Sequence, residues 1–458
     1  MAEDYNRFLL SKRRTDPPTG LTSIPDLPDS LMDFQDALTT WALRRGRAAI
    51  FAGTGLGKTI MELSWANSIH EATGKDVIIL APLAVAAQVV SEGNKFGIRA
   101  NRAASQDEVK PGITVTNYQK LDAFDVSRFV GVVLDESSIL KALDGKTKSQ
   151  LIARFKQTPY RLAATATPAP NDYMELGNHA EFLGVMQHTE MMSTFFVNDQ
   201  STTQKWRLKG HAEQDFWTWM GSWSVMLRSP EDIGYDGSRF DLPPLNQHQH
   251  TVETSKGPEG MLFKDEAQTL QERLAARRSS IDERVAHAAS ITPATGAFVW
   301  WCHLNDESEK LCKAISGAAE IRGSDKESLK EEKLKAFANG DIRVLVTKPS
   351  ITGWGLNWQH CSNTGFVGLS DSFEQVYQAI RRFWRFGQTK PVNVHFVAAD
   401  TEGAVVENIR RKEHQADYMA EKMVEHMADI TASNLRGSTR RVDAYEPSMK
   451  IKLPEFMK

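Results

Sequence analysis

The sequence predicts an α/β protein built from two parallel-sheet lobes in tandem. Short apolar runs alternate with helix-forming stretches, and these runs fall into two sets separated by a long insert. Such near-continuous runs are typical of parallel strands covered on both faces. The first set comprises Arg47–Phe51, Val77–Ala81, Ile113–Thr116, Val130–Leu134 and Leu162–Ala164. The second set comprises Ala297–Trp301, Arg343–Thr347, Gly365–Leu369 and Val392–Val397.

Composition shifts along the chain divide it into seven segments. A loose N-terminal arm rich in Pro, Asp and Ser precedes the first lobe, and an aromatic, helical insertion follows that lobe. After the second lobe, Val405, Ile409, Ala416, Met419, Met423 and Met427 recur at helical spacing, which predicts a bracing helix with one apolar face. The expected segments are the arm 1–30, first lobe 31–171, insertion 172–245, helical lead-in 246–292, second lobe 293–400, bracing helix 401–430 and flexible tail 431–458.

Charge and cysteine content narrow the possible classes of protein. The formal net charge of −3 excludes bulk electrostatic binding to nucleic acid, so any such contact needs a local basic groove. No apolar run is long enough to cross a bilayer, and the polar N-terminus is unlike a secretory signal. Cys302, Cys312 and Cys361 lack CxxC spacing, which indicates a reducing cytoplasm and disfavours zinc binding by Cys302, His303 and Cys312.

A phosphate-binding loop is predicted at Ala52–Thr59, with the sequence AGTGLGKT. It lies between an apolar strand and a helix-forming stretch, the context that such a loop requires. Gly53, Gly55 and Gly57, together with Thr54, would let backbone N–H groups surround phosphate oxygens. Lys58 would reach the β and γ phosphates, and Thr59 would offer its hydroxyl to Mg²⁺. The alternative is an ordinary glycine-rich turn.

An acidic pair, Asp135 and Glu136, directly follows the apolar run Val130–Leu134. The carboxyl end of a parallel strand lies at the edge of the sheet where the phosphate loop also lies. Asp135 would hold Mg²⁺, and Glu136 would orient or deprotonate the attacking water. Alone, such a pair is usually a solvated strand end, but its combination with Lys58 and Thr59 favours an ATP site.

The order of these motifs resembles that of superfamily-two helicases and translocases, over about residues 31–427. FQDALTTW is similar to the family's Gln motif, in which Gln35 would read adenine, and DESS resembles its acidic box. LAPLAVAAQ is similar to the motif that touches the nucleic-acid backbone. LAATATPAPND resembles the motif that couples hydrolysis to movement, with Thr165 and Thr167 as the expected hydroxyls.

Two motifs of the second lobe resemble the Swi/Snf branch of this superfamily. GWGLNW looks like its Gly-x-Gly-Leu-Asn motif, so Gly353, Gly355 and Asn357 are expected to take part in coupling. QAIRRFWRFGQ is similar to QAxDRxxRxGQ, which implies that Gln378 binds nucleotide and that Arg382 and Arg385 reach the γ-phosphate. The departures are Arg381 for Asp, Lys348-Pro349 for Ser-Thr, Ala166 and Pro170 in the coupling motif, and Ser137-Ser138 for Gly-His. They favour a minimal bacterial or phage enzyme.

The resemblance implies two RecA-like lobes that hydrolyse ATP with Mg²⁺ and move along double-stranded DNA. The alternative within the same class is a helicase that separates DNA or RNA strands. A nucleic-acid-binding scaffold with an inactive ATPase and a metabolic phosphate-loop kinase are less favoured, because neither accounts for all the motifs. For two features the sequence allows two interpretations, either contact with nucleic acid or a role at the surface or in packing. They are the basic clusters Arg44, Arg45, Arg47 and Arg410, Arg411, Lys412, and the tryptophans Trp206, Trp217, Trp219 and Trp223.

Overall fold

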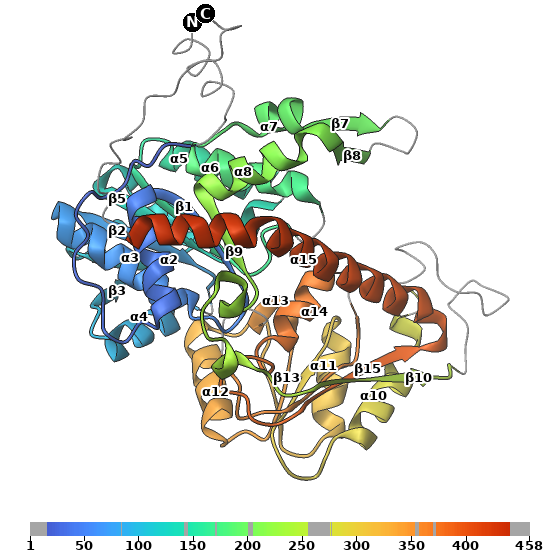
Figure 1. Ribbon diagram of the computed structural model, residues 1–458. Helices are drawn as coiled ribbons and strands as arrows, with labels where there is room; N and C mark the ends of the chain where they lie inside the picture. Colours follow the sequence, from blue (N-terminus) through green and yellow to red (C-terminus); the bar gives the residue numbers. More distant parts are fainter. Residues whose placement is uncertain are drawn as a thin grey trace, which may run out of the picture.

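The computed structural model shows two α/β lobes, one above the other in Figure 1, with a long helix crossing from one lobe to the other. It describes residues 16–83, 85–141, 145–169, 172–199, 205–254, 275, 277–352, 357–369 and 372–439. Each lobe is built on a parallel sheet, so the predicted fold class is confirmed.

In the described residues, the sheet of the first lobe has the strand order β3-β4-β2-β5-β6-β1-β9, all parallel. Its strands are β1 (Arg47–Ala52), β2 (Asp76–Ala81), β3 (Ala100–Arg102), β4 (Ile113–Asn117), β5 (Phe129–Asp135), β6 (Tyr160–Thr165) and β9 (Ser224–Leu227). All five runs predicted for this lobe are strands. Their side chains are buried on both faces, as expected of a parallel sheet between helical layers.

Helices cover both faces of this sheet and form two apolar cores. One core contains side chains of α2, α3 and α4, and the other contains side chains of α5 to α8. The bounds are α2 (Asp33–Arg45), α3 (Lys58–Thr73), α4 (Ala86–Lys95), α5 (Lys146–Phe155), α6 (Leu176–Leu183), α7 (His188–Phe195) and α8 (Glu213–Trp223). Short 3₁₀ turns lie at Gln106–Glu108, Tyr118–Ala123, Val126–Arg128, Ser137–Lys141 (η4), Tyr173–Glu175, Gly210–Ala212, Pro230–Ile233, Ser238–Phe240 (η8) and Asp400–Glu402.

The segment expected as an insertion adds both a strand and a core helix to the first lobe. β9 pairs with β1 beside the phosphate loop, and its four residues, SVML, are all buried. Trp217, Trp219 and Trp223 of α8 are buried in the core, and Trp206 packs against it. The packing interpretation of these tryptophans is therefore confirmed. An antiparallel pair, β7 (Phe196–Asp199) and β8 (Lys205–Leu208), projects from this region.

The sheet of the second lobe has the order β10-β15-β14-β11-β13-β12 over the described residues, also parallel. Its strands are β10 (Leu245–Val252), β11 (Phe298–Trp301), β12 (Ala318–Glu320), β13 (Val344–Thr347), β14 (Asn363–Phe366) and β15 (Val392–Ala399). β14 begins and ends earlier than the predicted Gly365–Leu369, because its pairing with β11 ends at Phe366. The helices are α10 (Ile281–Ile291), α11 (Asn305–Ala314), α12 (Glu327–Asn339), α13 (Pro349–Thr352) and α14 (Phe373–Ile380).

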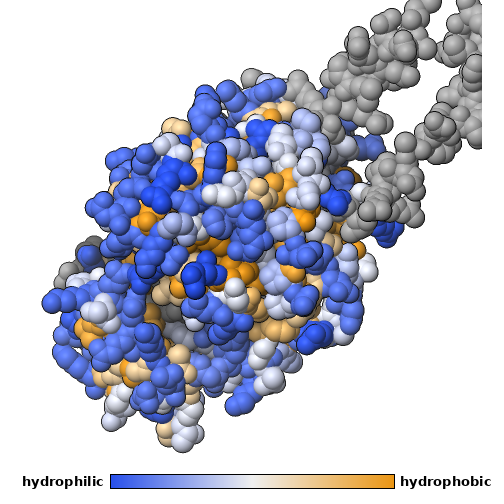
Figure 2. All heavy atoms as spheres, turned by 90° about the vertical axis from the view of Figure 1, so that its left-hand side faces the viewer, coloured by the Kyte–Doolittle hydropathy of each residue, from blue (hydrophilic) through white to orange (hydrophobic). Residues whose placement is uncertain are grey.

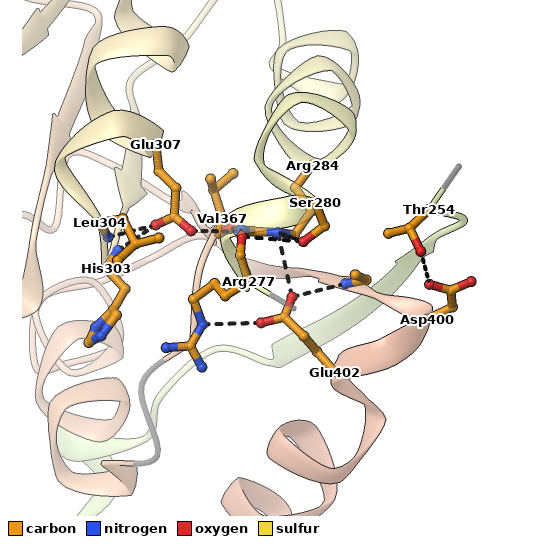
Figure 3. Close-up of polar contacts among 11 residues, drawn as sticks. Thr254, Arg277, Ser280, Arg284, His303, Leu304, Glu307, Val367, Asp400 and Glu402 are labelled. Carbon is orange, nitrogen blue, oxygen red and sulfur yellow. Dashed lines mark hydrogen bonds and ion pairs between the residues drawn. The ribbon is translucent and has the colours of Figure 1, made fainter. Parts of the chain in front are cut away.

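A buried network of charges joins several strand ends of the second lobe (Figure 3). The guanidinium of Arg284, which is fully buried, pairs with Glu307 at 2.8 Å and with Glu402 at 3.5 Å. Arg277 also pairs with Glu402, at 3.1 Å. Glu307 in turn accepts hydrogen bonds from the backbone N–H groups of His303 and Leu304, at the start of α11. The network therefore ties α10, α11 and the start of the last helix to one edge of the sheet.

The last helix, α15 (Gly403–Thr439), packs on both lobes. Val405 and Ile409 belong to the core of the second lobe, whereas Met419, Met423 and Met427 belong to that of the first. This confirms the predicted apolar stripe. The expected flexible tail, 431–458, is wrong at its start, because α15 continues to Thr439 and buries Thr431 and Leu435. The rest of that tail lies outside the described residues.

Part of the expected N-terminal arm also lies against the first lobe. The backbone N–H groups of Thr19, Gly20 and Leu21 donate to carbonyls at the end of α2, at 2.9–3.0 Å. Within the described ranges, no helix is both long and apolar enough to span a membrane. The same residues contain no cluster of three His, Cys, Asp or Glu side chains suited to a metal ion, and the three cysteines are free.

Candidate nucleotide site

The predicted phosphate loop lies between β1 and α3, with Lys58 as the first residue of the helix. Gly55 and Gly57 have φ values of +92° and +79°, which favour glycine. A Cβ on Gly55 would lie 2.9 Å from the backbone nitrogen of Phe386, and one on Gly57 would lie 2.3 Å from Gln35 Nε2. Lys58 Nζ donates to the carbonyl oxygens of Ala52 at 2.9 Å and Gly53 at 3.3 Å. The ammonium group is thus held at the loop.

The acidic pair lies at the end of β5, on the same sheet edge. Asp135 is the last residue of the strand, and its carbonyl accepts a hydrogen bond from the buried Tyr118 hydroxyl at 2.7 Å. Glu136 has φ +56°, a left-handed conformation that costs a non-glycine residue of order 1–3 kcal/mol and is concentrated at functional sites. Thr165 Oγ1 donates to Glu136 Oε2 at 3.2 Å and accepts from the backbone N–H of Thr167 at 3.1 Å.

Three carboxyl groups lie close together here, and the third was not predicted. Burial and the charge of Glu136 raise the pKa of Asp135 to about 7, with Lys58 acting in the opposite direction. Burial and then Asp135 raise the pKa of Glu62 well above its usual range. Glu62 lies one helical turn after Lys58, and neither of its carboxyl oxygens has a hydrogen-bond partner among the described residues. Its position one turn from the loop lysine was the available signal, but a glutamate inside an apolar helix resembles a solvated side chain in sequence.

The two arginines predicted in the second lobe face this carboxyl cluster. Arg382 is 2% exposed, and its guanidinium lies 5.2 Å from the ring of Trp358. Within the described structure, its Nε and both Nη atoms lack hydrogen-bond partners, as does Nε of Arg385. Burial and the neighbouring Arg385 lower the pKa of Arg382 well below its usual range, and Glu136 opposes this shift. Buried charges without partners are costly, so these side chains are suited to an anionic ligand.

A cavity of about 340 Å³ between the lobes brings most of the predicted residues together. Figure 2 shows a recess in the surface of the molecule on the face turned toward the viewer. The cavity is lined by Gln35, Thr54, Gly55, Gly57, Lys58, Thr59, Asp135, Glu136, Asn357, Gln378, Arg382 and Arg385. Gly53 and Thr167 line an adjoining cavity instead. Thr165 does not line the cavity between the lobes but contacts it through its hydrogen bond to Glu136. Gly353 and Gly355 lie outside the described residues.

The donors and acceptors of this cavity fit a magnesium nucleotide. Thr59 and Asp135 supply a hydroxyl and a carboxylate, the oxygen ligands that Mg²⁺ prefers. The buried Gln378 Nε2 and Asn357 Oδ1 have no partner among the described residues and can still form hydrogen bonds to a ligand. The amide of Gln35 is already engaged, since it accepts from Met32 N and donates to Leu56 O, each at 3.0 Å. Gln35 thus braces the loop in this structure.

Two aromatic residues at the cavity were also missed. Phe386, 37% exposed, and Phe240 have ring centroids 5.0 Å apart, and Phe240 meets Phe34 edge-on at 5.5 Å. Phe240 belongs to η8, in the chain between the lobes, where the sequence shows no motif. The aromatic series therefore links the helix of Gln35 to the loop of Arg385, which only the tertiary structure reveals.

The two basic clusters proposed as possible tracks are partly engaged within the protein. Arg45 Nη2 donates to Asp16 O at 2.5 Å, and Arg47 lies 3.8 Å from the Asp16 carboxylate. Arg410 Nη2 donates to Gln249 Oε1 at 2.8 Å. Arg381, which replaces the branch's Asp, stacks over the rings of Tyr377 and Trp384 at 5.0 and 4.4 Å. Arg381 also lines the cavity between the lobes.

Three similarities to known proteins bear on the class of this chain. Residues 31–170 match the family described as "Type III restriction enzyme, res subunit". The mouse protein "DNA annealing helicase and endonuclease ZRANB3" is 23% identical over 483 residues, covering 93% of this chain and 43% of that protein. The chain thus spans less than half the length of this curated relative. The solved structure "Sulfolobus solfataricus SWI2/SNF2 ATPase core in complex with dsDNA" has 16% identity and a TM-score of 0.41, covering 91% of this chain and 98% of that one.

Two parallel-sheet lobes, with a phosphate loop and an acidic pair on one and paired arginines on the other, form an arrangement similar to that of the ATP hydrolases of helicase superfamily two. Within that superfamily, the motifs GWGLNW and QAIRRFWRFGQ of the second lobe are similar to those of the Swi/Snf branch.

Proposed function

We propose that this chain is an ATP-driven motor that moves along double-stranded DNA. The observation that supports it best is the buried guanidinium of Arg382, which is unpartnered in the described structure and faces Glu136 across the cleft between the lobes. A site assembled from both lobes allows hydrolysis to follow their closure. The motifs of the second lobe favour duplex DNA over a single strand as the track.

Each side chain would have a separate part in hydrolysis. The loop N–H groups and Lys58 would bind the phosphates, and Thr59 with Asp135 would hold Mg²⁺, whose charge neutralises phosphate oxygens. Glu136 would orient the attacking water and accept its proton, with Thr165 fixing the carboxylate. Arg382 and Arg385 would stabilise the charge that develops on the transferred phosphoryl group. Gln378 would add a hydrogen bond from the arginine side of the site.

Movement would follow from alternate grips of the two lobes on the duplex. Such grips read phosphates and not bases, so the motor would work on any sequence and weaken with added salt. The segment Leu80–Gln88 of the first lobe, similar to a backbone-contacting motif, is the proposed contact on that lobe.

ATP hydrolysis measured without nucleic acid and with single-stranded DNA, duplex DNA or RNA tests this proposal. We expect duplex DNA to stimulate the most, and Lys58→Ala and Arg385→Ala to abolish the stimulated rate. An arginine that completes a phosphoryl-transfer site contributes roughly 10³–10⁵-fold in rate. Absence of hydrolysis on every nucleic acid would refute the proposal.

Movement itself can be separated from strand separation. A third strand bound in a triplex should be displaced from the duplex by the moving protein, whereas a forked duplex should stay paired. Unwinding of the fork, with stimulation mainly by single strands or RNA, would instead support a strand-separating helicase.

A further inference from the structure

A contact between the lobes lies beside the nucleotide cavity. It joins the segment of the acidic box to α14, the helix that precedes Arg382 and Arg385. Glu374, in the first turn of α14, forms an ion pair with Lys141 of η4 (Ser137–Lys141). The same carboxylate accepts a hydrogen bond from Ser138 Oγ at 3.3 Å. Ser138 follows Asp135 by three residues, and it is one of the two positions at which the acidic box departs from the branch's pattern.

The lobe-one side of this contact is held firmly. The side chain of Asn178 in α6 donates to the carbonyls of Leu140 at 2.8 Å and Lys141 at 3.3 Å. Ser137 Oγ lies 3.1 Å from Nε2 of the buried His179. Two adjacent residues of α6 thus fix η4 at both of its ends. Ser138 and Lys141 therefore present a partner surface of fixed geometry to the second lobe.

The lobe-two side transmits position along α14 and the turn that follows it. Glu374 is only 10% exposed, and Gln378 lies one turn after it on α14. Arg382 lies two residues beyond the end of α14; its backbone N–H donates to Ala379 O at 3.4 Å, and its carbonyl accepts from Trp358 N at 3.0 Å. At a rise of about 1.5 Å per residue, the helix from Glu374 to Ile380 spans roughly 9 Å toward the arginine. A shift of α14 at Glu374 would therefore move Gln378 and Arg382 with it.

We propose that Glu374 is a positioning residue of the ATPase. It sets where the turn after α14, which carries Arg382 and Arg385, meets the acidic pair when the lobes close. This role rests on the proposed function, since it concerns the same site. Glu374 does not line the nucleotide cavity, so it acts through Arg382 and not on the phosphate. A carboxylate shared by Ser138 and Lys141 fixes both distance and direction, as a charge-assisted pair does.

The test is kcat and KM for ATP with saturating duplex DNA, in Glu374→Gln, Lys141→Met and the double variant. We expect kcat to fall about 10–100-fold in Glu374→Gln, because a misplacement of about 1 Å at a reacting centre can cost 10²-fold. KM for ATP should stay within about threefold, since the phosphate loop lies on the first lobe. The double variant should fall no further than the worse single variant, because the two residues act through one contact.

The matched control is another ionic contact between the lobes in the part of the chain that the structure describes. Arg102 of β3 pairs with Glu327 and Glu331 of α12, with Nη1–Oε1 of Glu331 at 2.9 Å. These side chains are exposed by a third or more and lie outside the nucleotide cavity. Arg102→Gln removes a contact of the same kind, and we expect kcat to stay within about twofold. An equal loss in Arg102→Gln and Glu374→Gln would overturn the proposal, because it would show general loosening of the lobes.

A readout independent of hydrolysis completes the experiment. Spin labels are attached to cysteines introduced at the exposed positions Lys75 and Asp341, in a protein that carries Cys312→Ser so that this partly exposed cysteine is not labelled. They report the distance between the lobes in the presence of a non-hydrolysable ATP analogue, Mg²⁺ and duplex DNA. Glu374→Gln should broaden this distance distribution and Arg102→Gln should not. Unchanged kcat and unchanged distances in Glu374→Gln would refute the role of Glu374 while leaving the motor intact. If the unaltered protein hydrolyses no ATP, the proposed function fails and the distances alone decide about Glu374.

Discussion

The left-handed conformation of Glu136 is held in place by its neighbours. Its φ of +56° would be strained in isolation, and the hydroxyl of Thr165 donates to its carboxylate at 3.2 Å. The same hydroxyl accepts from Thr167 N and so fixes the start of the coupling motif. A single side chain thus connects the proposed water-orienting group with the segment expected to report hydrolysis.

Replacement of Thr165 by Val should separate catalysis from binding. The variant keeps the shape of the side chain but removes the hydrogen bond to Glu136, which is worth about 1.5–3 kcal/mol when one partner is charged. We expect kcat for ATP to fall about 10–100-fold with little change in nucleotide affinity, measured by steady-state kinetics and by binding of a fluorescent nucleotide. Thr114→Val is the control, because the buried Thr114 hydroxyl has no partner among the described residues. A similar loss in both variants would contradict this role.

His179 should make the protein less stable in acid. Burial lowers the pKa of His179 to about 4, so its imidazole stays neutral in the folded protein until the pH approaches that value. Below about 6.5, the usual value of His, the unfolded chain takes up a proton that the folded chain does not, and stability falls until the pH reaches the folded pKa. Each unit of difference in pKa corresponds to 1.36 kcal/mol, so the unfolding free energy should fall by about 3 kcal/mol between pH 7 and pH 4.

Urea unfolding at pH 7 and pH 4 measures this effect. In His179→Gln, the difference in unfolding free energy between the two pH values should be about 3 kcal/mol smaller than in the unaltered protein. The exposed His211→Gln serves as the control. A pH dependence unchanged by His179→Gln would show that this residue does not contribute.

At the scale of elements, the sequence predicts strands well where both faces are buried. β1, β2 and β5 are apolar runs within the first sheet, and each was predicted to within one residue of its bounds, whereas β6 begins two residues before the predicted start. β10 was missed because its sequence, LNQHQHTV, is polar and largely exposed at the edge of the second sheet. Pairing with β15, and not its own composition, makes it a strand.

The buried charge network should stabilise α10 and α11 far more than their surface ion pair. Glu307 is fully buried against Arg284, whereas Asp282 and Lys310 are 78% and 46% exposed. Glu307→Ala removes the nearer of the two carboxylates that pair with the buried Arg284, leaving only Glu402 at 3.5 Å, and should cost about 3–5 kcal/mol of unfolding free energy. Asp282→Asn should cost less than about 1 kcal/mol. Chemical denaturation of both variants checks this, and equal costs would contradict it.

At the scale of the whole molecule, α15 connects the lobes through close packing on α8. A Cβ on Gly221 would lie 2.3 Å from Ile430 Cγ2, and Asn434 Nδ2 donates to Gly221 O at 2.7 Å. The rings of Trp217 and His426 stack nearby, 5.0 Å apart. Small size at position 221 therefore allows the end of α15 to reach the first lobe.

Gly221→Ala should reverse the usual sign of a glycine replacement in a helix. Alanine normally stabilises a helix by about 1 kcal/mol relative to glycine, but here the clash with Ile430 should destabilise the fold by about 1–3 kcal/mol. Gly437→Ala, where no atom lies within 4 Å, is the matched control and should be neutral or stabilising. Thermal unfolding of both variants measures the difference. A stabilising Gly221→Ala would show that α15 is not packed there as described.

The sequence by itself determined the fold class and most of the residues of the candidate nucleotide site. Phosphate loops, acidic strand ends and apolar strands are local patterns, because their chemistry depends on neighbours in the chain. Only the tertiary structure decided which residues meet across the cleft. Phe240 and Glu374 belong to no sequence motif, and Glu62 and Phe386, although they lie beside or within predicted motifs, have surroundings that come from segments distant in sequence. Burial and pairing between lobes depend on how helices and sheets pack, and that packing is not encoded at any one position.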